Sequence, residues 1–324
     1  MNAISREKII ATFGEWTAMS IKLSDGSYTR TPAVDHRLRR LLQVAQDVVA
    51  KPLSECRVLD LACLEGHYAV EFAMHGAEAI GLEGRSVSVA KCDFVKRNLK
   101  LDRLQFHEDD VRNLSKVKYG TFDIVICSGI LYHLKAPDAV GFLKSIYEVC
   151  DGVLLIDTFV SLSGQATERV GDRDVHGHHY FEHFDYDDEK AKQARLWASI
   201  DNATSFWFTE PTLMNILTDC GFTSVMDVLT PTMPGNPRDR KTYVAVKGSR
   251  AVVQSSDITS NEPIHDIPEG INPKIDGSQI PRGKLFKLAK AVLPPSIKEA
   301  IKPVLRAVRV LPKDTTPEFM KKKC

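Results

Sequence analysis

Short apolar runs alternate with longer, helix-compatible stretches through most of the chain as far as Lys247. The runs are rich in Val, Ile and Leu and are bounded by polar or small residues, which is typical of strands buried in a sheet. Strands are predicted at 57–61, 79–83, 104–111, 122–128, 152–158, 224–230 and 241–247, and helices at 35–49, 67–75, 86–99 and 138–149. Strands that alternate with helices form βαβ units. The pattern therefore predicts a Rossmann-like α/β fold: a mostly parallel seven-stranded sheet with helices on both faces and an antiparallel C-terminal edge strand.

Carboxylates stand at the ends of the first three predicted strands. Asp60 lies near the end of the first strand, Glu83 closes the second, and Asp109 and Asp110 lie near the end of the third. The C-terminal ends of parallel strands meet at one edge of a sheet, where ligands bind. A carboxylate in the position of Glu83 can accept two hydrogen bonds from ribose hydroxyls. The helix predicted after Asp60 would present free N–H groups at the same edge. These features predict a nucleotide site there.

The turn after the first strand reads Asp60-x-Ala62-x-Leu64-x-Gly66. This spacing differs from the dinucleotide-binding GxGxxG motif. It resembles the first motif of the class I S-adenosylmethionine (SAM) methyltransferases, in which an acidic residue precedes alternating small positions. Two positions that usually hold glycine are here Ala62 and Leu64. The later strand ends fall in the order found in that superfamily, and the resemblance covers residues 35–248. It implies a SAM-dependent methyltransferase with SAM as its cofactor.

The same resemblance implies roles for the residues at the strand ends. Asp60 and the turn after it would hold the methionine end of SAM, Glu83 the ribose, and Asp110 the adenine, with Asp109 as the alternative to Asp110. The implied cofactor-binding residues are Asp60, Ala62, Cys63, Gly66, Glu83, Asp109, Asp110, Val111, Ser128 and Gly129.

The loop after the fourth strand runs from Gly129 through Ile, Leu and Tyr to His133. It is similar to the loop of the tRNA wobble-uridine carboxymethyltransferases, which use carboxy-SAM, and to that of many small-molecule and glycan-linked methyltransferases. The run from Asn202 to Pro211 is similar to a segment of the same group. His133 is the candidate catalytic residue, because an imidazole titrates near neutrality and can take a proton from a hydroxyl or amine acceptor. In similar loops this histidine orders the turn or contacts substrate instead.

Residues 159–210 form an insertion after the fifth predicted core strand, rich in His, Asp and aromatic residues. In the superfamily such insertions build the acceptor pocket and its lid. The candidate substrate-binding residues are Tyr132, Arg173, His179, Tyr180, Glu182, Asn202 and Trp207. His179 and His183 would share one face of a helix, as metal ligands do. Gly177 and the aromatic residues around it are more typical of a lid loop, so no metal site is predicted.

Three further segments are predicted outside the core. Residues 1–34 are expected to form an N-terminal cap segment, a helix followed by an irregular or hairpin turn. Residues 249–281 are polar with scattered Pro and Gly, which indicates a flexible linker. Residues 282–324 hold twelve Lys or Arg against three acids, a charge of +9, so that the preceding residues carry −8. Because apolar residues recur there at helical spacing, a basic amphipathic helical tail is predicted, placed on an anionic membrane surface or on the acidic body.

The cysteine content and the lengths of the apolar runs indicate where in the cell the protein is located. The seven cysteines include no CxxC pair and lie largely in apolar contexts, which favours reduced thiols. The N-terminus lacks the apolar region of a signal peptide, and no apolar run approaches transmembrane length. A cytoplasmic protein is predicted, peripheral to the inner membrane face if the tail binds lipid. Nucleic acid is disfavoured as a partner because the body is net acidic.

The leading hypothesis is a SAM-dependent methyltransferase that acts on a small-molecule, sugar or lipid-linked glycan acceptor by in-line displacement. One alternative is a carboxy-SAM-type tRNA uridine modifying enzyme, whose cofactor carboxylate would need a cation or a strong donor, such as Tyr132 with Arg240 or Lys241. The other is a catalytically degenerate SAM-fold binding module, prompted by Ala62 and Leu64. The retained acids Asp60 and Glu83 favour catalysis.

Overall fold

The computed structural model describes residues 5–229, 233 and 235–248, all of which lie in one compact unit, Met1–Ile267. The predicted linker at 249–281 and the predicted basic tail at 282–324 lie outside the described residues. In the described part, no helix is long and apolar enough to cross a membrane.

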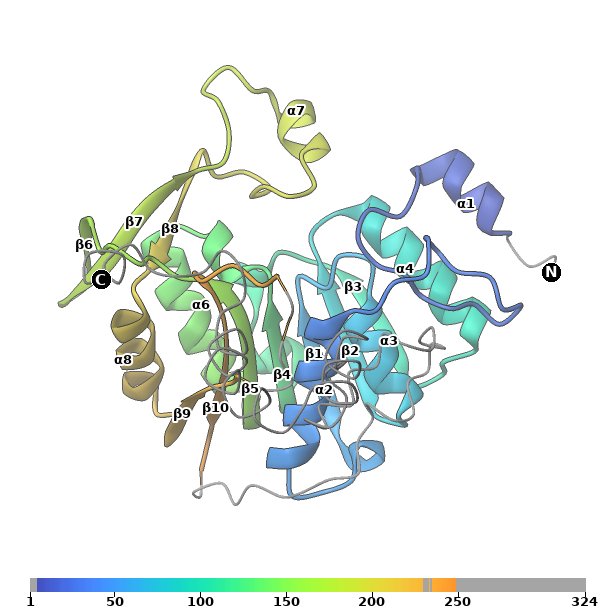
Figure 1. Cartoon of the computed structure of the whole chain (residues 1–324), viewed down its shortest axis with the longest axis horizontal. Helices are drawn as coiled ribbons and strands as arrows, with labels where there is room; N and C mark the ends of the chain where they lie inside the picture. The colour runs from blue at the N-terminus through green and yellow to red at the C-terminus, as the bar shows by residue number, and fades with distance from the viewer. Residues whose placement is uncertain (1–4, 230–232, 234, 249–324) are drawn as a thin grey trace, which may run out of the picture. The chain divides into compact units, whose positions relative to one another are not determined.

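A seven-stranded sheet forms the centre, with the strand order β3-β2-β1-β4-β5-β10-β9 (Figure 1). The first five strands pair in parallel, and β10 pairs antiparallel with both β5 and β9. The predicted fold class is confirmed, and the antiparallel strand β10 lies between β5 and the edge strand β9. The strands are β1 (Arg57–Leu61), β2 (Glu78–Glu83), β3 (Leu104–Glu108), β4 (Phe122–Ser128), β5 (Cys150–Phe159), β9 (Ser224–Asp227) and β10 (Arg240–Val246).

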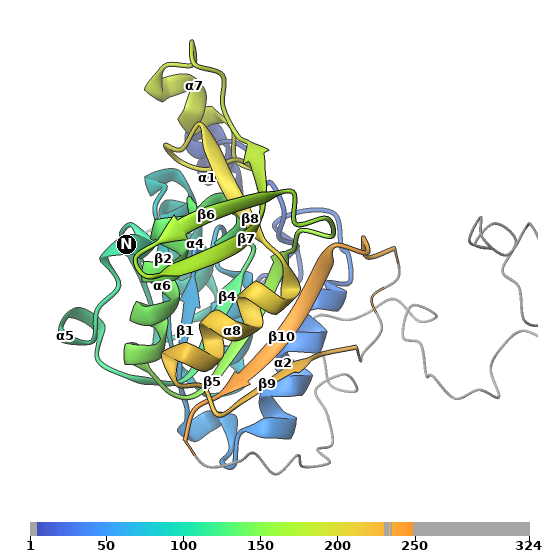
Figure 2. The same cartoon turned by 90° about the vertical axis from the view of Figure 1, so that its left-hand side faces the viewer.

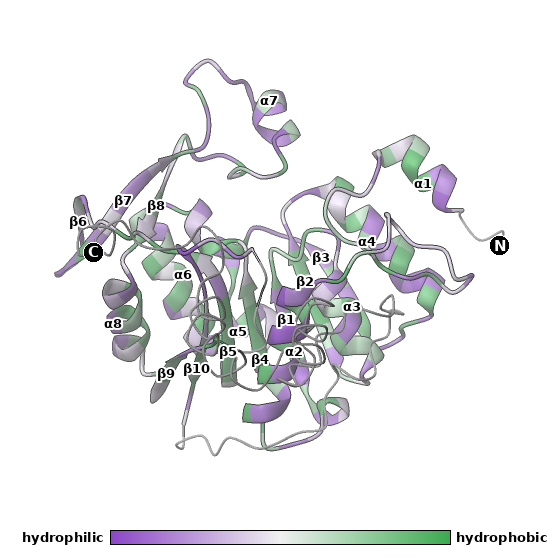
Figure 3. Ribbon diagram, viewed as in Figure 1, coloured by the Kyte–Doolittle hydropathy of each residue, from purple (hydrophilic) through white to green (hydrophobic). Residues whose placement is uncertain are grey.

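Helices cover both faces of this sheet, which explains why its strands read as nearly continuous apolar runs. Alternate residues of β1 point to opposite sides: Val58 belongs to one buried cluster, whereas Leu59 and Leu61 belong to the other. Figure 3 shows the apolar residues concentrated in the central strands. One cluster includes residues of α1 (Arg6–Phe13), α2 (His36–Val48), α3 (His67–Met74) and α4 (Ser86–Leu99), and the other includes residues of α5 (Lys116–Tyr119), α6 (Ala136–Val149) and α8 (Glu210–Cys220).

The insertion at 159–210 builds a second sheet of three antiparallel strands, β6 (Ala166–Val170), β7 (Arg173–Phe181) and β8 (Thr204–Phe208). Figures 1 and 2 show β7 and β8 rising beyond the end of the main sheet, with α7 (Glu189–Ala194) at the tip. The prediction of a lid loop around Gly177 is therefore wrong, because that segment is the middle of β7. Pairing with β8, which no local pattern reveals, holds it extended. His179 and His183 accordingly do not share a helix.

The N-terminal segment packs against α4 and the first turn. Trp16 is buried, its ring centroid 5.8 Å from that of Phe94. The predicted turn is present, since Lys22 and Tyr28 form an antiparallel bridge. The backbone N–H groups of residues 17–19 donate to the buried carboxylate of Glu65. This contact brings Met19 to the C-terminal edge of the sheet.

Candidate active site

A cavity of about 450 Å³ lies at the C-terminal ends of β1, β2 and β4. This is the switch point of the sheet, where β1 is flanked by β2 on one side and β4 on the other. The cavity lies within the size range of small-molecule sites. The predicted residues that line it are Asp60, Ala62, Cys63, Glu83, Asp109, Asp110, Val111, Ser128, Gly129, Tyr132 and His133.

The turn between β1 and α3 has an unusual backbone. Ala62 and Leu64 both adopt the left-handed conformation, with φ of 52° and 51°. Each costs roughly 1 kcal/mol in a residue that carries a side chain. These are the two positions at which the resemblance leads one to expect glycine, so the chain keeps the tight turn despite the substitutions. Gly66 is not among the lining residues. An added Cβ there would meet the ring of Phe106 at 2.7 Å, so the close packing requires glycine. Its role is packing beneath the turn.

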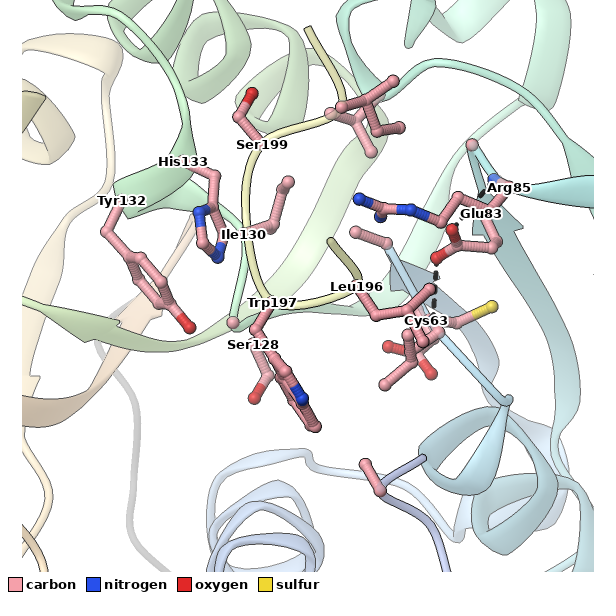
Figure 4. A pocket seen from close by; sticks show the side chains of 18 of the residues that line it. Cys63, Glu83, Arg85, Ser128, Ile130, Tyr132, His133, Leu196, Trp197 and Ser199 are labelled. Carbon is pink, nitrogen blue, oxygen red and sulfur yellow. Dashed lines mark hydrogen bonds between the residues drawn. The ribbon is translucent and has the colours of Figure 1, made fainter. Parts of the chain in front are cut away.

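Asp60 and Glu83 place two buried carboxylates at one end of the cavity. Asp60 accepts a hydrogen bond from the N–H of Ala69 in α3, at 3.1 Å, and burial raises the pKa of its carboxyl to about 7. Glu83 accepts from the N–H groups of Leu64 and Arg85, both at 2.9 Å (Figure 4). Burial also raises the pKa of Glu83. Two carboxylates out of water favour a cation or a hydroxyl-bearing ligand at this end.

The two acids after β3 are held by neighbouring side chains. Although burial opposes it, hydrogen bonds from Asn113, Lys118 and Tyr119 keep the pKa of Asp109 low, at about 2. Asp110 accepts from both the backbone and the guanidinium of Arg112. Both residues border the cavity, but their carboxylates are largely committed to these internal partners. Contact with an adenine amino group would therefore come as an addition to these bonds.

His133 lies on the side of the cavity opposite Glu83, in the 3₁₀ turn Leu131–His133 that follows β4. Its Nδ1 lies 2.9 Å from Oε1 of Glu182, and its backbone carbonyl accepts from Asn202 at 3.1 Å. Figure 4 shows the imidazole beside the cavity, with Tyr132 next to it. Glu182 also accepts from Ser205 Oγ at 2.7 Å and from the N–H of Ser199 at 3.0 Å.

These contacts correct the role predicted for Glu182 and Asn202. Neither lines the cavity, and both are buried behind His133 and fix its ring and its turn. A carboxylate only accepts hydrogen bonds, so the proton of the neutral imidazole lies on Nδ1 and Nε2 keeps its lone pair. The arrangement fixes the orientation of the imidazole at the edge of the cavity.

The aromatic candidates form a stack behind the cavity wall. Trp207 is sandwiched between Phe159 and Tyr180, with ring centroids 4.8 and 4.6 Å away. Phe159 lines the cavity, whereas Trp207 and Tyr180 support it from behind. They are not the direct substrate contacts that we predicted.

Arg173 and His179 are also placed away from the cavity. Arg173 pairs with Asp219 of α8, and His179 lies 3.5 Å from the carboxylate of Glu168 on β6. Alternation along β7 explains His179, because it points to the side opposite Tyr180. The substrate role predicted for these two residues finds no support in their positions.

The segment 195–201 borders the cavity and is held over it by two arginines. Arg85 donates to the carbonyls of Arg195 and Ala198, at 3.3 and 3.0 Å. Arg112 pairs with Asp201 at 2.7 Å. This segment of the insertion therefore covers the end of the cavity near Glu83.

The lining residues that were missing from the predicted set include Arg37, Tyr68 and Phe159. Arg37 lies in the first turn of α2 and Tyr68 in the first turn of α3. A charged residue at the start of a helix is usually solvent-exposed, so no local pattern indicated a role for Arg37. Among the described residues, no group of three or more His, Cys, Asp or Glu is arranged to hold a metal ion.

Comparisons with known proteins agree with this fold. A methyltransferase-domain family model matches residues 52–200. The tRNA U34 carboxymethyltransferase of Helicobacter pylori (strain Shi470) is 27% identical over 115 residues, which cover 34% of this chain and 43% of the relative. The enzyme of the same name from Sulfurimonas denitrificans is 29% identical over 119 residues, covering 33% and 36%. The chain thus spans less than half the length of these curated relatives.

A solved structure covers more of the chain. The N-terminal domain of EvdMO1, crystallised in the presence of S-adenosylhomocysteine (SAH) and D-fucose, is similar with a TM-score of 0.57 at 19% identity. The match covers 76% of this chain and 95% of that domain. At this identity the likeness concerns the fold.

Proposed function

Because the chain carries a methyltransferase domain of the class I SAM-dependent fold, we propose that it methylates a hydroxyl or amine of a small-molecule, sugar or lipid-linked glycan acceptor. The observation that carries the proposal is the pair His133–Glu182, in which the imidazole is held at the edge of a cavity whose other end holds two buried carboxylates.

The residues of the cavity fit SAM. When bound, SAM supplies a methyl group made electrophilic by its sulfonium. Asp60 would balance positive charge at the methionine end, and Glu83 would accept from the ribose hydroxyls. The left-handed backbone at Ala62 and Leu64 lets the main chain approach a ligand closely there. Asp109 and Asp110 border the end assigned to adenine.

His133 would take the proton of the acceptor through Nε2 as the acceptor becomes nucleophilic. Glu182 keeps Nδ1 protonated and stabilises the imidazolium that results. The segment 195–201 excludes water from the reacting groups, and positioning supplies much of the rate in such a transfer. Base catalysis of this kind contributes typically about 10²-fold or more.

The first experiment is a calorimetric titration of the full chain with SAM and SAH. Glu83→Ala should weaken binding of both by more than tenfold. Glu108→Ala removes an exposed acid from the end of β3, outside the cavity, and should leave binding unchanged. If wild type binds neither compound, the binding-module alternative and the enzyme proposal both fail.

Catalysis is then tested by following SAH formation against panels of hydroxyl and amine acceptors. With an active acceptor, His133→Gln should lower kcat about 100-fold while the Kd of SAM stays unchanged. An unaltered kcat would remove His133 from the base role. SAM binding without turnover on any panel member would favour the degenerate binding module.

A second candidate, a carboxy-SAM-type tRNA uridine modifying enzyme, is favoured by one observation. The guanidinium of Arg240 lies 2.9 Å from the hydroxyl of Tyr132 at the cavity wall, where both could meet an added carboxylate. The names of the curated relatives point the same way. Tighter binding of carboxy-SAM than of SAM would select this candidate, and the net acidic body speaks against it.

A further inference from the structure

Two arginines converge on one buried carboxylate at the end of the cavity opposite Glu83. Asp157, in β5, has no solvent exposure. Its Oδ1 lies 2.8 Å from Nε of Arg37 and accepts a hydrogen bond from Nε of Arg240. Its Oδ2 accepts from Thr242 Oγ1 at 2.7 Å. The single carboxylate of Asp157 therefore interacts with two guanidinium groups.

Further charged groups surround Asp157 and the two arginines. Asp35 approaches Arg37, but its Oδ1 also caps α2 by accepting from the N–H groups of Arg37 and Leu38, both at 2.9 Å. Behind the pair, Arg40 donates to Thr242 and contributes a further positive charge. Asp227 lies farther along β9, where Lys241 faces it at 3.5 Å.

Both arginines of the pair line the cavity. One third of the Arg37 side chain is exposed. Arg240 is nearly buried, with its guanidinium carbon 4.9 Å from the ring centre of Tyr132 and 4.7 Å from that of Phe159. This subsite therefore combines positive charge with an aromatic wall, and it lies next to His133, whose ring centroid is 4.3 Å from that of Tyr132.

We propose that the acceptor carries a carboxylate, held by Arg37 and Arg240 against the rings of Tyr132 and Phe159. This inference rests on the proposed function, because it assigns the acceptor to the end of the cavity next to His133. A guanidinium matches the planar geometry of a carboxylate and can bind it through two parallel N–H donors. The carboxylates Asp60 and Glu83 occupy the other end, so the cavity is polarised: a cationic cofactor fits one end and an anionic acceptor fits the other.

The test uses the full chain saturated with SAH, with benzoate as the probe and benzamide as its neutral counterpart of the same shape. Binding is measured by calorimetry or ligand-observed NMR. We expect benzoate to bind at least tenfold more tightly than benzamide. Arg37→Gln should abolish that preference, and Arg39→Gln, a change on the same helix outside the cavity, should preserve it. Arg37→Gln is chosen because Arg240 is nearly buried and its loss would disturb packing.

The outcomes separate an acceptor carboxylate from a carboxylate of the cofactor. If carboxy-SAM binds more tightly than SAM, Tyr132 and Arg240 hold the added carboxylate of that cofactor, and the acceptor assignment is wrong. Equal binding of benzoate and benzamide to wild type would overturn the proposal, as would an unchanged preference in Arg37→Gln. If Arg37→Gln weakens SAH itself by tenfold or more, Arg37 binds the carboxylate of the cofactor and the acceptor assignment is wrong. Failure of wild type to bind SAH is seen in the first titration, and it would reject the proposed function before any probe is added.

Discussion

Replacing Asp60 by Asn should make the protein more stable at alkaline pH and a weaker binder of SAM. Asp60 is buried at the end of β1, and burial raises the pKa of its carboxyl from an ordinary 3.8 to about 7. The nearby charge of Glu83 acts in the same direction, while the N–H of Ala69 opposes it. Ionisation of Asp60 therefore lowers the free energy of unfolding of the protein.

The size of that cost follows from the shift. About three pKa units correspond to roughly 4 kcal/mol. The folded state binds the proton more tightly than the unfolded state, so the cost is absent below about pH 4, grows as the pH rises and is complete above pH 7. Asn cannot ionise, yet its side-chain oxygen can still accept from Ala69. After roughly 2 kcal/mol for burying the amide, the free energy of unfolding of Asp60→Asn should exceed that of wild type by about 2 kcal/mol at pH 8.

Cofactor binding should show the opposite effect. Positive charge on SAM stabilises the ionised carboxylate, so binding to wild type releases a proton below pH 7 and tightens as the pH rises from 5.5 to 7.5. Asp60→Asn lacks this group. Its affinity should be at least tenfold weaker at pH 8, and the proton release assigned to Asp60 should be missing.

Urea unfolding at pH 5.5 and pH 8 measures the stability change, and calorimetry in two buffers of different ionisation enthalpy measures the proton release. Glu108→Gln, an exposed acid at the end of β3, is the matched control and should alter neither. The reasoning is refuted if Asp60→Asn is less stable than wild type at pH 8, or if its proton release matches that of wild type.

Three further substitutions follow from local geometry. Ala62→Gly relieves a φ of 52° and should raise the free energy of unfolding by about 1 kcal/mol in urea titrations, and a loss of stability would show that this turn is not strained. Gly177→Ala places a Cβ 2.1 Å from the carbonyl oxygen of Trp207 and should lower the melting temperature by several degrees, whereas Gly141→Ala, in a helix with open space, should leave it equal or higher. Glu182→Gln should lower kcat about 10- to 100-fold without changing the Kd of SAM, because a neutral amide no longer fixes and stabilises the imidazole of His133; an equal loss of SAM binding would instead indicate a folding defect.

The fold and the cofactor end of the cavity could be predicted because their signals are local. Each core strand is a short apolar run, and Asp60 and Glu83 stand at the ends of their own strands. Parallel pairing then carries both carboxylates to one edge without further information. The unusual glycine replacements were also visible, although only the backbone shows that Ala62 and Leu64 keep the left-handed turn.

The inserted sheet could not be predicted in the same way, since its pairing is distant in sequence. Gly177 lies opposite Phe208 across β7 and β8, and a run of histidines and aromatics carries no periodicity that distinguishes a strand from a loop. The cluster around Asp157 was even harder to predict from local sequence patterns. It joins Arg37 of α2 with Arg240 of β10, and neither residue is distinguished by its neighbours in the chain.

Glu182 shows what kind of information the sequence lacks. The sequence places an acid among histidines and aromatics in the insertion, but whether it faces the cavity or lies behind His133 depends on the direction of one side chain. The structure buries it and gives it three hydrogen-bond donors, from His133, Ser199 and Ser205. Ser199 belongs to the segment that covers the cavity. The carboxylate that contacts Nδ1 of His133 is therefore also bonded to this segment, so displacing the segment would remove one of the donors that hold Glu182 against His133.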